Sequence, residues 1–366
     1  YFHSDADAQV KVPAWLNDPT MYHNRGDSTF SGENSLYGDF FGLDDLFTER
    51  PEVVRGMSDI YKSWVDFGID GFRIDTVKHV NTEFWQRFVP AIQNEARRIG
   101  NRDFFAFGEV FDADPKYMST FTTEAKLPAT LDFGFQARAR AFAASKPTAA
   151  LADLYALDDY YTDRDSNAYA LPTFLGNHDM GRIGNFLVND NPTAGATELL
   201  QRDRLAHSLM YLTRGQPVVY YGDEQGFVGD NGGDQNARQD MFASQVASYN
   251  DDPLIIGSDQ LGSRARYDRS HPLYRHLRAL SRLVGEHPAL RDGAQITRFS
   301  SDSAGAFAVS RIDAREQVEY LVALNNSTEP QTVTLPTYSV DMRFRGLWPS
   351  GTRAVTSDGS REVTVT

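Results

Sequence analysis

The stretch GIDGFRIDTVKH, residues 68–79, decides the fold of this chain of 366 residues. A short apolar run ends in two charged residues, Arg73 and Asp75, which is the pattern of a buried strand that leads into a polar loop. Helical periodicity starts at Pro51, before the run, and a second amphipathic helix follows it, with Thr82 as its expected cap. The stretch therefore predicts a βα unit of a parallel sheet.

The same alternation continues along the chain. Further strands are expected near residues 104, 130, 171 and 217, with helices at 148–160, 198–212 and 271–285. After about Ala294, short alternating segments predict a small antiparallel β domain. Residues 1–47, rich in Gly, Asp, Asn, Ser and aromatic residues, show no periodicity and predict an irregular loop region.

Composition and charge narrow the class of protein. Hydrophobic residues make up 41% and charged residues 23% of the chain, as in ordinary globular proteins. A net charge of −14 disfavours a nucleic-acid partner. The absence of cysteine excludes disulfides, thiolate nucleophiles and cysteine-ligated zinc. No apolar run approaches ~18 residues, so we expect no membrane-spanning helix.

Acidic residues follow the predicted strands directly, at Asp75, Glu109, Asp179 and Asp223. In a (β/α) barrel the carboxyl ends of the strands meet at one mouth, where active sites are built. A helix N-cap is the ordinary structural alternative for each acid. Arg73 lies two residues before Asp75 and so shares its face of the strand, where a guanidinium favours an ionised carboxylate, as a nucleophile needs.

Five motifs carry a resemblance to the α-amylase family of glycoside hydrolases. They are, in chain order, LDDL at 43–46, GFRIDTVKH at 71–79, GEV at 108–110, FLGNHD at 174–179 and the segment from GQP to GDE at 215–224. The resemblance covers about residues 1–293, and the β tail is similar to the C-terminal sandwich of that family.

The resemblance implies a role for each of three carboxylates. Asp75 would be the nucleophile, Glu109 the general acid/base, and Asp179 the carboxylate that binds sugar hydroxyls and stabilises the transition state. Such a retaining glycosidase holds its two reacting carboxyl groups ~5–5.5 Å apart. Glu109 must start protonated, which an apolar site favours by raising its pKa.

The resemblance also implies five substrate-binding residues. Arg73 would orient Asp75, and His178 would contact the sugar at the cleavage subsite. Lys78 and His79 resemble residues that line the leaving-group subsites, in a pairing more typical of endo-acting α-amylases than of small α-glucosidases. Arg182 resembles a position that reaches the non-reducing subsites.

The expected fold class is α/β, a (β/α)8 TIM barrel with a loop excursion after strand three and a C-terminal antiparallel β-sandwich. The expected domains are the excursion at 1–47, strands four to eight of the barrel within 48–293, and the β domain at 294–366. The first signature region of the family and the first three βα units have no counterpart in the sequence. We expect them on another chain or in residues outside this sequence.

A structural calcium ion is the expected cofactor, because Asp45 and the backbone carbonyl of His79 match two ligands of the family's site and calcium suits oxygen ligands. The Asn that supplies another ligand in the family belongs to the absent region, and a plain loop acid is the alternative for Asp45. Residues 230–234, DNGGD, lack the closing Glu of an EF-hand and predict a flexible loop near the substrate cleft.

The predicted function is hydrolysis of α-1,4-glucosidic bonds in starch-like α-glucans. The alternatives are α-1,6 debranching as in pullulanase, cyclomaltodextrinase or transglycosylase activity, and a non-catalytic scaffold subunit of the same family. An α-glucan oligo- or polysaccharide is the expected partner, with no nucleic acid and no membrane, and the complete protein is expected to be a monomer. Secretion is the expected localisation, with the cytoplasm as the alternative.

Overall fold

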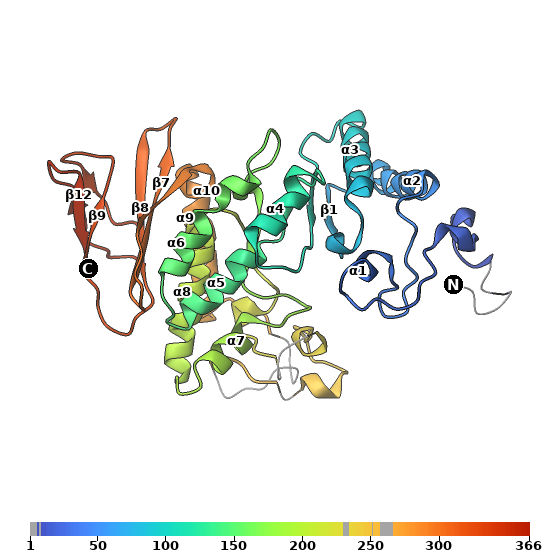
Figure 1. Ribbon diagram of the computed structural model, residues 1–366. Coiled ribbons are helices and arrows are strands. Elements are labelled where there is room, and N and C mark those ends of the chain that lie inside the picture. Colours follow the sequence, from blue (N-terminus) through green and yellow to red (C-terminus); the bar gives the residue numbers. More distant parts are fainter. Residues whose placement is uncertain (1–5, 7–8, 230–233, 251, 257–265) are drawn as a thin grey trace. The chain divides into compact units, whose positions relative to one another are not determined.

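The computed structural model describes residues 6, 9–229, 234–250, 252–256 and 266–366. The chain forms two compact units (Figure 1). Unit 1 consists of residues 1–131 and 160–167, and unit 2 of residues 132–159 and 168–366. Among the described residues, no helix is both long and apolar enough to cross a membrane.

Unit 1 contains a parallel sheet in the order β1-β2-β3. Its strands are β1 (Gly71–Ile74), β2 (Phe105–Gly108) and β3 (Ala129–Thr130). The helices of the unit are α2 (Pro51–Phe67) before β1, α3 (Thr82–Arg98) between β1 and β2, and α4 (Pro115–Thr123) between β2 and β3. The strands near residues 69, 104 and 130 and their parallel pairing are thus confirmed.

The helix boundaries follow from capping residues. Pro51 is the first residue of α2, where its missing N–H costs nothing, and Gly68 ends the helix with a φ of 106°. The prediction that Thr82 caps α3 is wrong by one residue, because Asn81 has the extended backbone of the cap and Thr82 begins the helix. Asn and Thr both suit a cap, so the sequence does not choose between these neighbours.

Residues 9–47 form the irregular region that the sequence predicts. They contain only short helical turns, at Ala14–Asn17, Pro19–Met21 and α1 (Asn34–Tyr37), together with isolated bridges such as that between Tyr22 and Leu46.

Unit 2 contains the parallel pair β4 (Pro172–Phe174) and β5 (Gln216–Val218), which confirms the strands near 171 and 217. Its helices are α5 (Phe133–Ala143), α6 (Ala149–Tyr155), α7 (Ile183–Asp190), α8 (Ala196–Leu212), α9 (Pro272–Glu286) and α10 (Pro288–Asp292). Helix α6 ends at Tyr155 and is shorter than the expected helix at 148–160.

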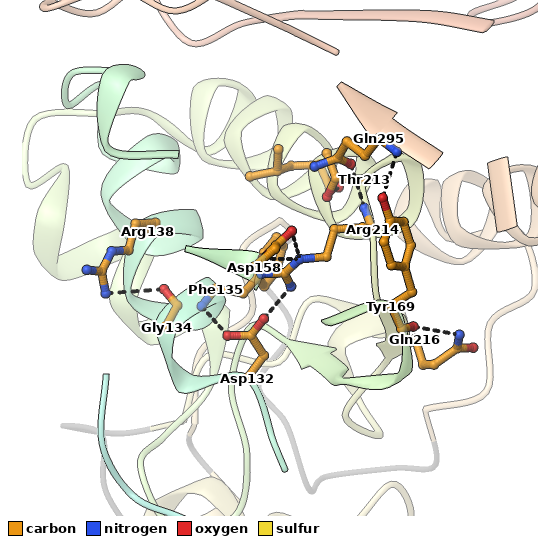
Figure 2. A network of polar contacts seen from close by, with 11 residues as sticks. Asp132, Gly134, Phe135, Arg138, Asp158, Tyr169, Thr213, Arg214, Gln216 and Gln295 are labelled. Carbon is orange, nitrogen blue, oxygen red and sulfur yellow. Dashed lines mark hydrogen bonds and ion pairs between the residues drawn. The ribbon is translucent and has the colours of Figure 1, made fainter. Parts of the chain in front are cut away.

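A completely buried arginine, Arg214, fixes the start of β5 (Figure 2). Its guanidinium pairs with the carboxylates of Asp132 and Asp158. Its backbone N–H donates to the side chain of Gln295 at 2.7 Å, and the N–H of Gln295 donates to the Tyr169 hydroxyl at 2.8 Å. Because the buried cation has two carboxylate partners, the network joins α5, β5 and the C-terminal strands without leaving the guanidinium unpaired.

The C-terminal strands are antiparallel, as expected, and share a core with the helices of unit 2. A three-stranded sheet, β6 (Ala294–Phe299), β7 (Ala306–Asp313) and β8 (Val318–Asn325), lies beside α10. On β7, Phe307 and Val309 pack into the helical core, while Ala308 packs with Leu335 and Val363. These last two belong to the pair β9 (Val333–Pro336) and β12 (Glu362–Val365), and β10 (Arg343–Phe344) pairs with β11 (Val355–Thr356). Strand β7 is therefore buried on both faces.

Candidate active site

The ends of β1 and β2 bring three predicted site residues together in unit 1. Ile74 lies opposite Gly108, and the N–H of Glu109 donates to the carbonyl of Ile74 at 2.7 Å. Asp75 and Glu109 therefore leave neighbouring parallel strands at the same level. The Arg73 guanidinium lies 3.3 Å from the Asp75 carboxylate, which confirms that the two side chains share one face.

The two carboxyl groups have different environments. Glu109 is only 9% exposed, whereas the side chain of Asp75 is 63% exposed. Burial raises the pKa of Glu109, and a hydrogen bond with Asp75 and the charge of Asp75 raise it further. The N–H of Thr76, 3.2 Å from Oε2 of Glu109, and the charge of Arg73 act in the opposite direction. The outcome is a carboxyl group that stays protonated to higher pH than an ordinary glutamate, beside an exposed carboxylate.

Thr76 is a site residue that sequence reasoning missed. Its φ of 53° lies in the left-handed region, which a β-branched residue seldom adopts. This backbone directs the N–H of Thr76 at Glu109 and lets the N–H of Val77 donate to the Glu109 carbonyl at 3.1 Å. Such strain concentrates at functional sites. No sequence signal marks a threonine as left-handed, so only the structure reveals it.

Lys78 and His79 lie in the short helical turn after β1, Val77–His79. The Lys78 ammonium donates to the carbonyl of Phe111, beyond β2, at 2.7 Å. His79 is half-buried, and its ring contacts Ser35 and the edges of Phe30 and Phe40. Burial lowers the pKa of His79, which favours the neutral imidazole. The ring connects the turn after β1 to the segment that contains Phe30, Ser35 and Phe40.

Asp45, the predicted calcium ligand, takes part in a cluster with a histidine. Nδ1 of His23 lies 2.6 Å from the Asp45 carboxylate, and Nε2 lies 2.9 Å from Glu49. Burial, together with the charges of Asp39 and Glu49, raises the pKa of Asp45, although His23 opposes this. In the described ranges, no group of three or more His, Cys, Asp or Glu side chains has the geometry to hold a metal ion.

In unit 2, His178 and Asp179 lie together on a tight turn after β4. Nε2 of His178 is 3.1 Å from the Asp179 carboxylate. The Asn177 side chain closes the turn by accepting from the N–H groups of Asp179 and Met180, each at 2.9 Å. Arg238, which sequence reasoning missed, donates to the Asp179 carboxylate at 3.1 Å and to the His178 carbonyl at 3.2 Å.

The structure corrects the role expected for Arg182. Its side chain is completely buried and so cannot contact a sugar. The guanidinium donates to the carbonyl of Tyr221 at 2.6 Å and to the Gln239 side chain at 2.7 Å. Asp223, also buried, lies 3.6 Å away, and burial raises the pKa of Asp223 to about 7. The predicted loop at 230–234 lies outside the described residues except for Asp234.

Paired carboxyl groups at the carboxyl ends of neighbouring parallel strands place the protein in the class of α/β proteins with a strand-end active site. A sequence profile of the family "Alpha amylase, catalytic domain" matches residues 1–255. The chain belongs to the alpha-amylase family.

Individual relatives agree with this assignment. The chain is 54% identical to an alpha-amylase of Streptomyces lividans over 99% of its own length and 39% of that protein. It is 29% identical to a cyclomaltodextrin glucanotransferase of Geobacillus stearothermophilus, over 94% of the chain and 42% of that protein. Among solved structures, an Anoxybacillus alpha-amylase is similar with a TM-score of 0.76 and 26% identity, over 96% of this chain and 69% of that one. The chain thus spans about two fifths of these two curated relatives.

Proposed function

We propose that the protein hydrolyses α-1,4-glucosidic bonds of starch-like α-glucans with retention of the anomeric configuration. The observation that carries the proposal is the contrast between Glu109, buried with a raised pKa, and Asp75, exposed beside a guanidinium. When two neighbouring carboxyl groups have such different environments, one can act as the proton donor and the other as the nucleophile. Membership of the alpha-amylase family supplies the substrate class.

The reaction proceeds by double displacement. The Asp75 carboxylate attacks the anomeric carbon while Glu109 donates its proton to the departing glycosidic oxygen, so the bond between sugars breaks and a glycosyl ester forms. Glu109, now ionised, then takes a proton from a water molecule whose oxygen attacks the same carbon and releases Asp75. Arg73 orients Asp75 throughout.

Asp179 and His178 would bind sugar hydroxyls as the glucosyl ring distorts, with Arg238 holding the Asp179 carboxylate in place. Lys78 and His79 would line the leaving-group side. In the same proposal, the chain contributes to the (β/α)8 barrel of its family. The complete protein would be a secreted monomer, since a polymeric substrate is met outside the cell.

Transfer to a second sugar is the strongest alternative, because cyclomaltodextrin glucanotransferases are among the relatives. The two reactions share the glycosyl ester and differ only in whether water or a sugar hydroxyl attacks it. Cleavage of α-1,6 bonds and of cyclomaltodextrins uses the same carboxylates with other subsites. The higher identity to a protein named alpha-amylase favours hydrolysis of α-1,4 bonds.

Calcium at Asp45 fits the residues in part. A half-buried carboxylate whose pKa is raised by burial and by the neighbouring Asp39 and Glu49 would be stabilised by a cation. His23 already contacts the same carboxylate, which leaves one oxygen for a metal. Asp45 and the His79 carbonyl would hold the ion, whose chemistry would be structural, and no step of the reaction uses it.

The test compares the natural-length protein with its Asp75→Asn variant on amylose, on pullulan and on cyclomaltodextrin, with the products and their anomeric form resolved in time. We expect α-anomeric maltooligosaccharides from amylose and a loss of several orders of magnitude in the variant. Activity within tenfold of the wild type, in a variant with unchanged circular dichroism, would contradict the role of Asp75. Larger products than the substrate would favour transfer.

A further inference from the structure

Arg182 joins three segments of unit 2, one of which is the turn that carries Asp179. It ends the turn that carries Asp179, and the N–H and carbonyl groups of Asn177 and Gly181 close that turn by pairing with each other at 3.0 and 3.2 Å. Through its guanidinium it holds the Tyr221 carbonyl after β5 and the side chain of Gln239. The Gln239 side chain is completely buried as well, so its position is set by Arg182 and not by solvent.

Gln239 connects Arg182 to the segment that contacts the Asp179 carboxylate. Its chain neighbour Arg238 donates to the Asp179 carboxylate and to the His178 carbonyl. Arg182 therefore constrains Asp179 twice, once through the backbone of the turn and once through the segment that presents Arg238.

The environment of Arg182 keeps its guanidinium in a single place. The cation lies over the rings of Tyr220, Tyr221 and Phe227, at 4.5, 4.9 and 5.1 Å from their centroids. Gly222 allows the approach of Phe227, because a Cβ atom there would overlap the Phe227 ring. Aromatic faces around a desolvated guanidinium add cation–π attraction to its hydrogen bonds.

Ionisable side chains on two further elements lie near the guanidinium or near its neighbour Asp223. Asp223 lies 3.6 Å from the guanidinium, and its other charged neighbours are Glu224 on its own turn and the pair Asp203 and His207 on α8. Within that pair, Nδ1 of His207 lies 2.7 Å from the Asp203 carboxylate, and both side chains are buried.

We propose that Arg182 is a positioning residue for catalysis, which sets the place of the Asp179 carboxylate through the 177–181 turn and through Gln239 and Arg238. The inference rests on the proposed role of Asp179 in α-glucan hydrolysis. In this proposal Arg182 does not contact the sugar and instead affects catalysis through the position of Asp179.

The test is a double-mutant cycle in the natural-length protein, with Arg182→Met introduced into the wild type and into Asp179→Asn. A displacement of about 1 Å at a reacting group costs about 10²-fold, so we expect kcat on an aryl maltooligoside to fall about 100-fold in the wild type with KM changed less than about threefold. In the Asp179→Asn background the same substitution should change kcat by less than about threefold. An equal loss in both backgrounds would overturn the proposal.

Arg214→Met is the matched control, since Arg214 is equally buried, is paired with two carboxylates and lies over the Tyr155 ring. Its hydrogen bonds within the described residues go to Asp132, Asp158 and Gln295, which lie outside the 177–181 turn. Per folded molecule it should leave kcat within about twofold of the wild type. If Arg182→Met does not fold, Gln239→Leu removes one of the two links and should give a smaller loss with the same dependence on Asp179.

A second readout does not depend on activity. The amide hydrogens of Asp179 and Met180 should exchange at least about tenfold faster in Arg182→Met than in Arg214→Met, because the turn loses its anchor. Unchanged exchange would overturn the positioning role even in a protein without activity on α-glucans. Wild-type protein without that activity would instead refute the proposed function.

Discussion

Replacing Gly71 with alanine tests whether the pairing of β1 with β2 positions the two reacting carboxyl groups. Gly71 lies opposite Phe105 in the first pair of these strands. A Cβ atom at Gly71 would overlap the carbonyl oxygen of Phe105 and lie 3.2 Å from its carbonyl carbon. Since both are backbone atoms, no side-chain rotation relieves the overlap. The strands must separate by about 1 Å before the oxygen reaches an ordinary C···O distance of about 3.3 Å.

The size of the effect follows from this displacement. Asp75 and Glu109 come directly after Ile74 and Gly108, the last pair of the same two strands. Overpacking of this kind costs about 1–3 kcal/mol of the free energy of unfolding. A displacement of about 1 Å between reacting groups lowers the rate about 10²-fold. We therefore expect kcat/KM on soluble starch to fall about 100-fold in Gly71→Ala, with folding retained.

Gly285→Ala is the matched control, because it adds the same methyl group near the end of α9, where a Cβ atom meets open space. It should raise the free energy of unfolding by up to about 1 kcal/mol and leave kcat/KM unchanged. Urea denaturation and initial rates on both variants measure these quantities. If Gly71→Ala matched Gly285→Ala in stability and rate, the argument from strand pairing would be refuted.

Three further outcomes are expected. Glu109→Gln should spare aryl glycosides, which need little protonation, more than starch; equal losses would point to a structural Glu109. Folding raises the pKa of Glu109, so the protonated carboxyl group contributes stability that is present below its unfolded pKa of about 4.5 and is lost as the pH rises through the folded pKa. The stability of Glu109→Gln relative to the wild type should therefore increase from acidic to neutral pH, which denaturation midpoints at several pH values would measure. Chelation of calcium should lower the melting temperature of the natural-length wild type but not that of Asp45→Ala. A wild-type melting curve that does not change with chelator would rule the calcium site out.

The pattern of apolar runs that end in acidic residues, together with the parallel direction of the strands, was sufficient to predict the part of the site near β1 and β2. Parallel strands place their carboxyl ends side by side, so two acids that each follow an apolar run are expected to be neighbours. The alternation of side chains along a strand predicts the contact between Arg73 and Asp75 in the same way. These inferences use only local periodicity, which the sequence records directly.

The residues that were missed or misassigned depend on information that local periodicity does not contain. The left-handed backbone of Thr76 is held by contacts to Glu109, which belongs to the next strand. Arg182 is buried because Tyr221 and Gln239, about 40 and 57 residues further on, supply its partners. Arginine is seldom buried completely, so sequence alone assigns such a residue to the surface or to substrate. Arg238 was missed because its partner Asp179 lies 59 residues before it in the sequence.

In the proposed reaction, the assignment of acid and nucleophile follows from the backbone and not from the residue types. Glu109 leaves β2 with its N–H bonded to Ile74 and its side chain turned into the unit, where burial favours the neutral carboxyl. Asp75 leaves β1 with 63% of its side chain exposed and with the Arg73 guanidinium 3.3 Å from its carboxylate. Exchanging the proposed roles would put the charge on the buried carboxyl group of Glu109, and burial disfavours that form. The directions of the two side chains therefore support the proposal that Glu109 donates the proton and Asp75 attacks the sugar.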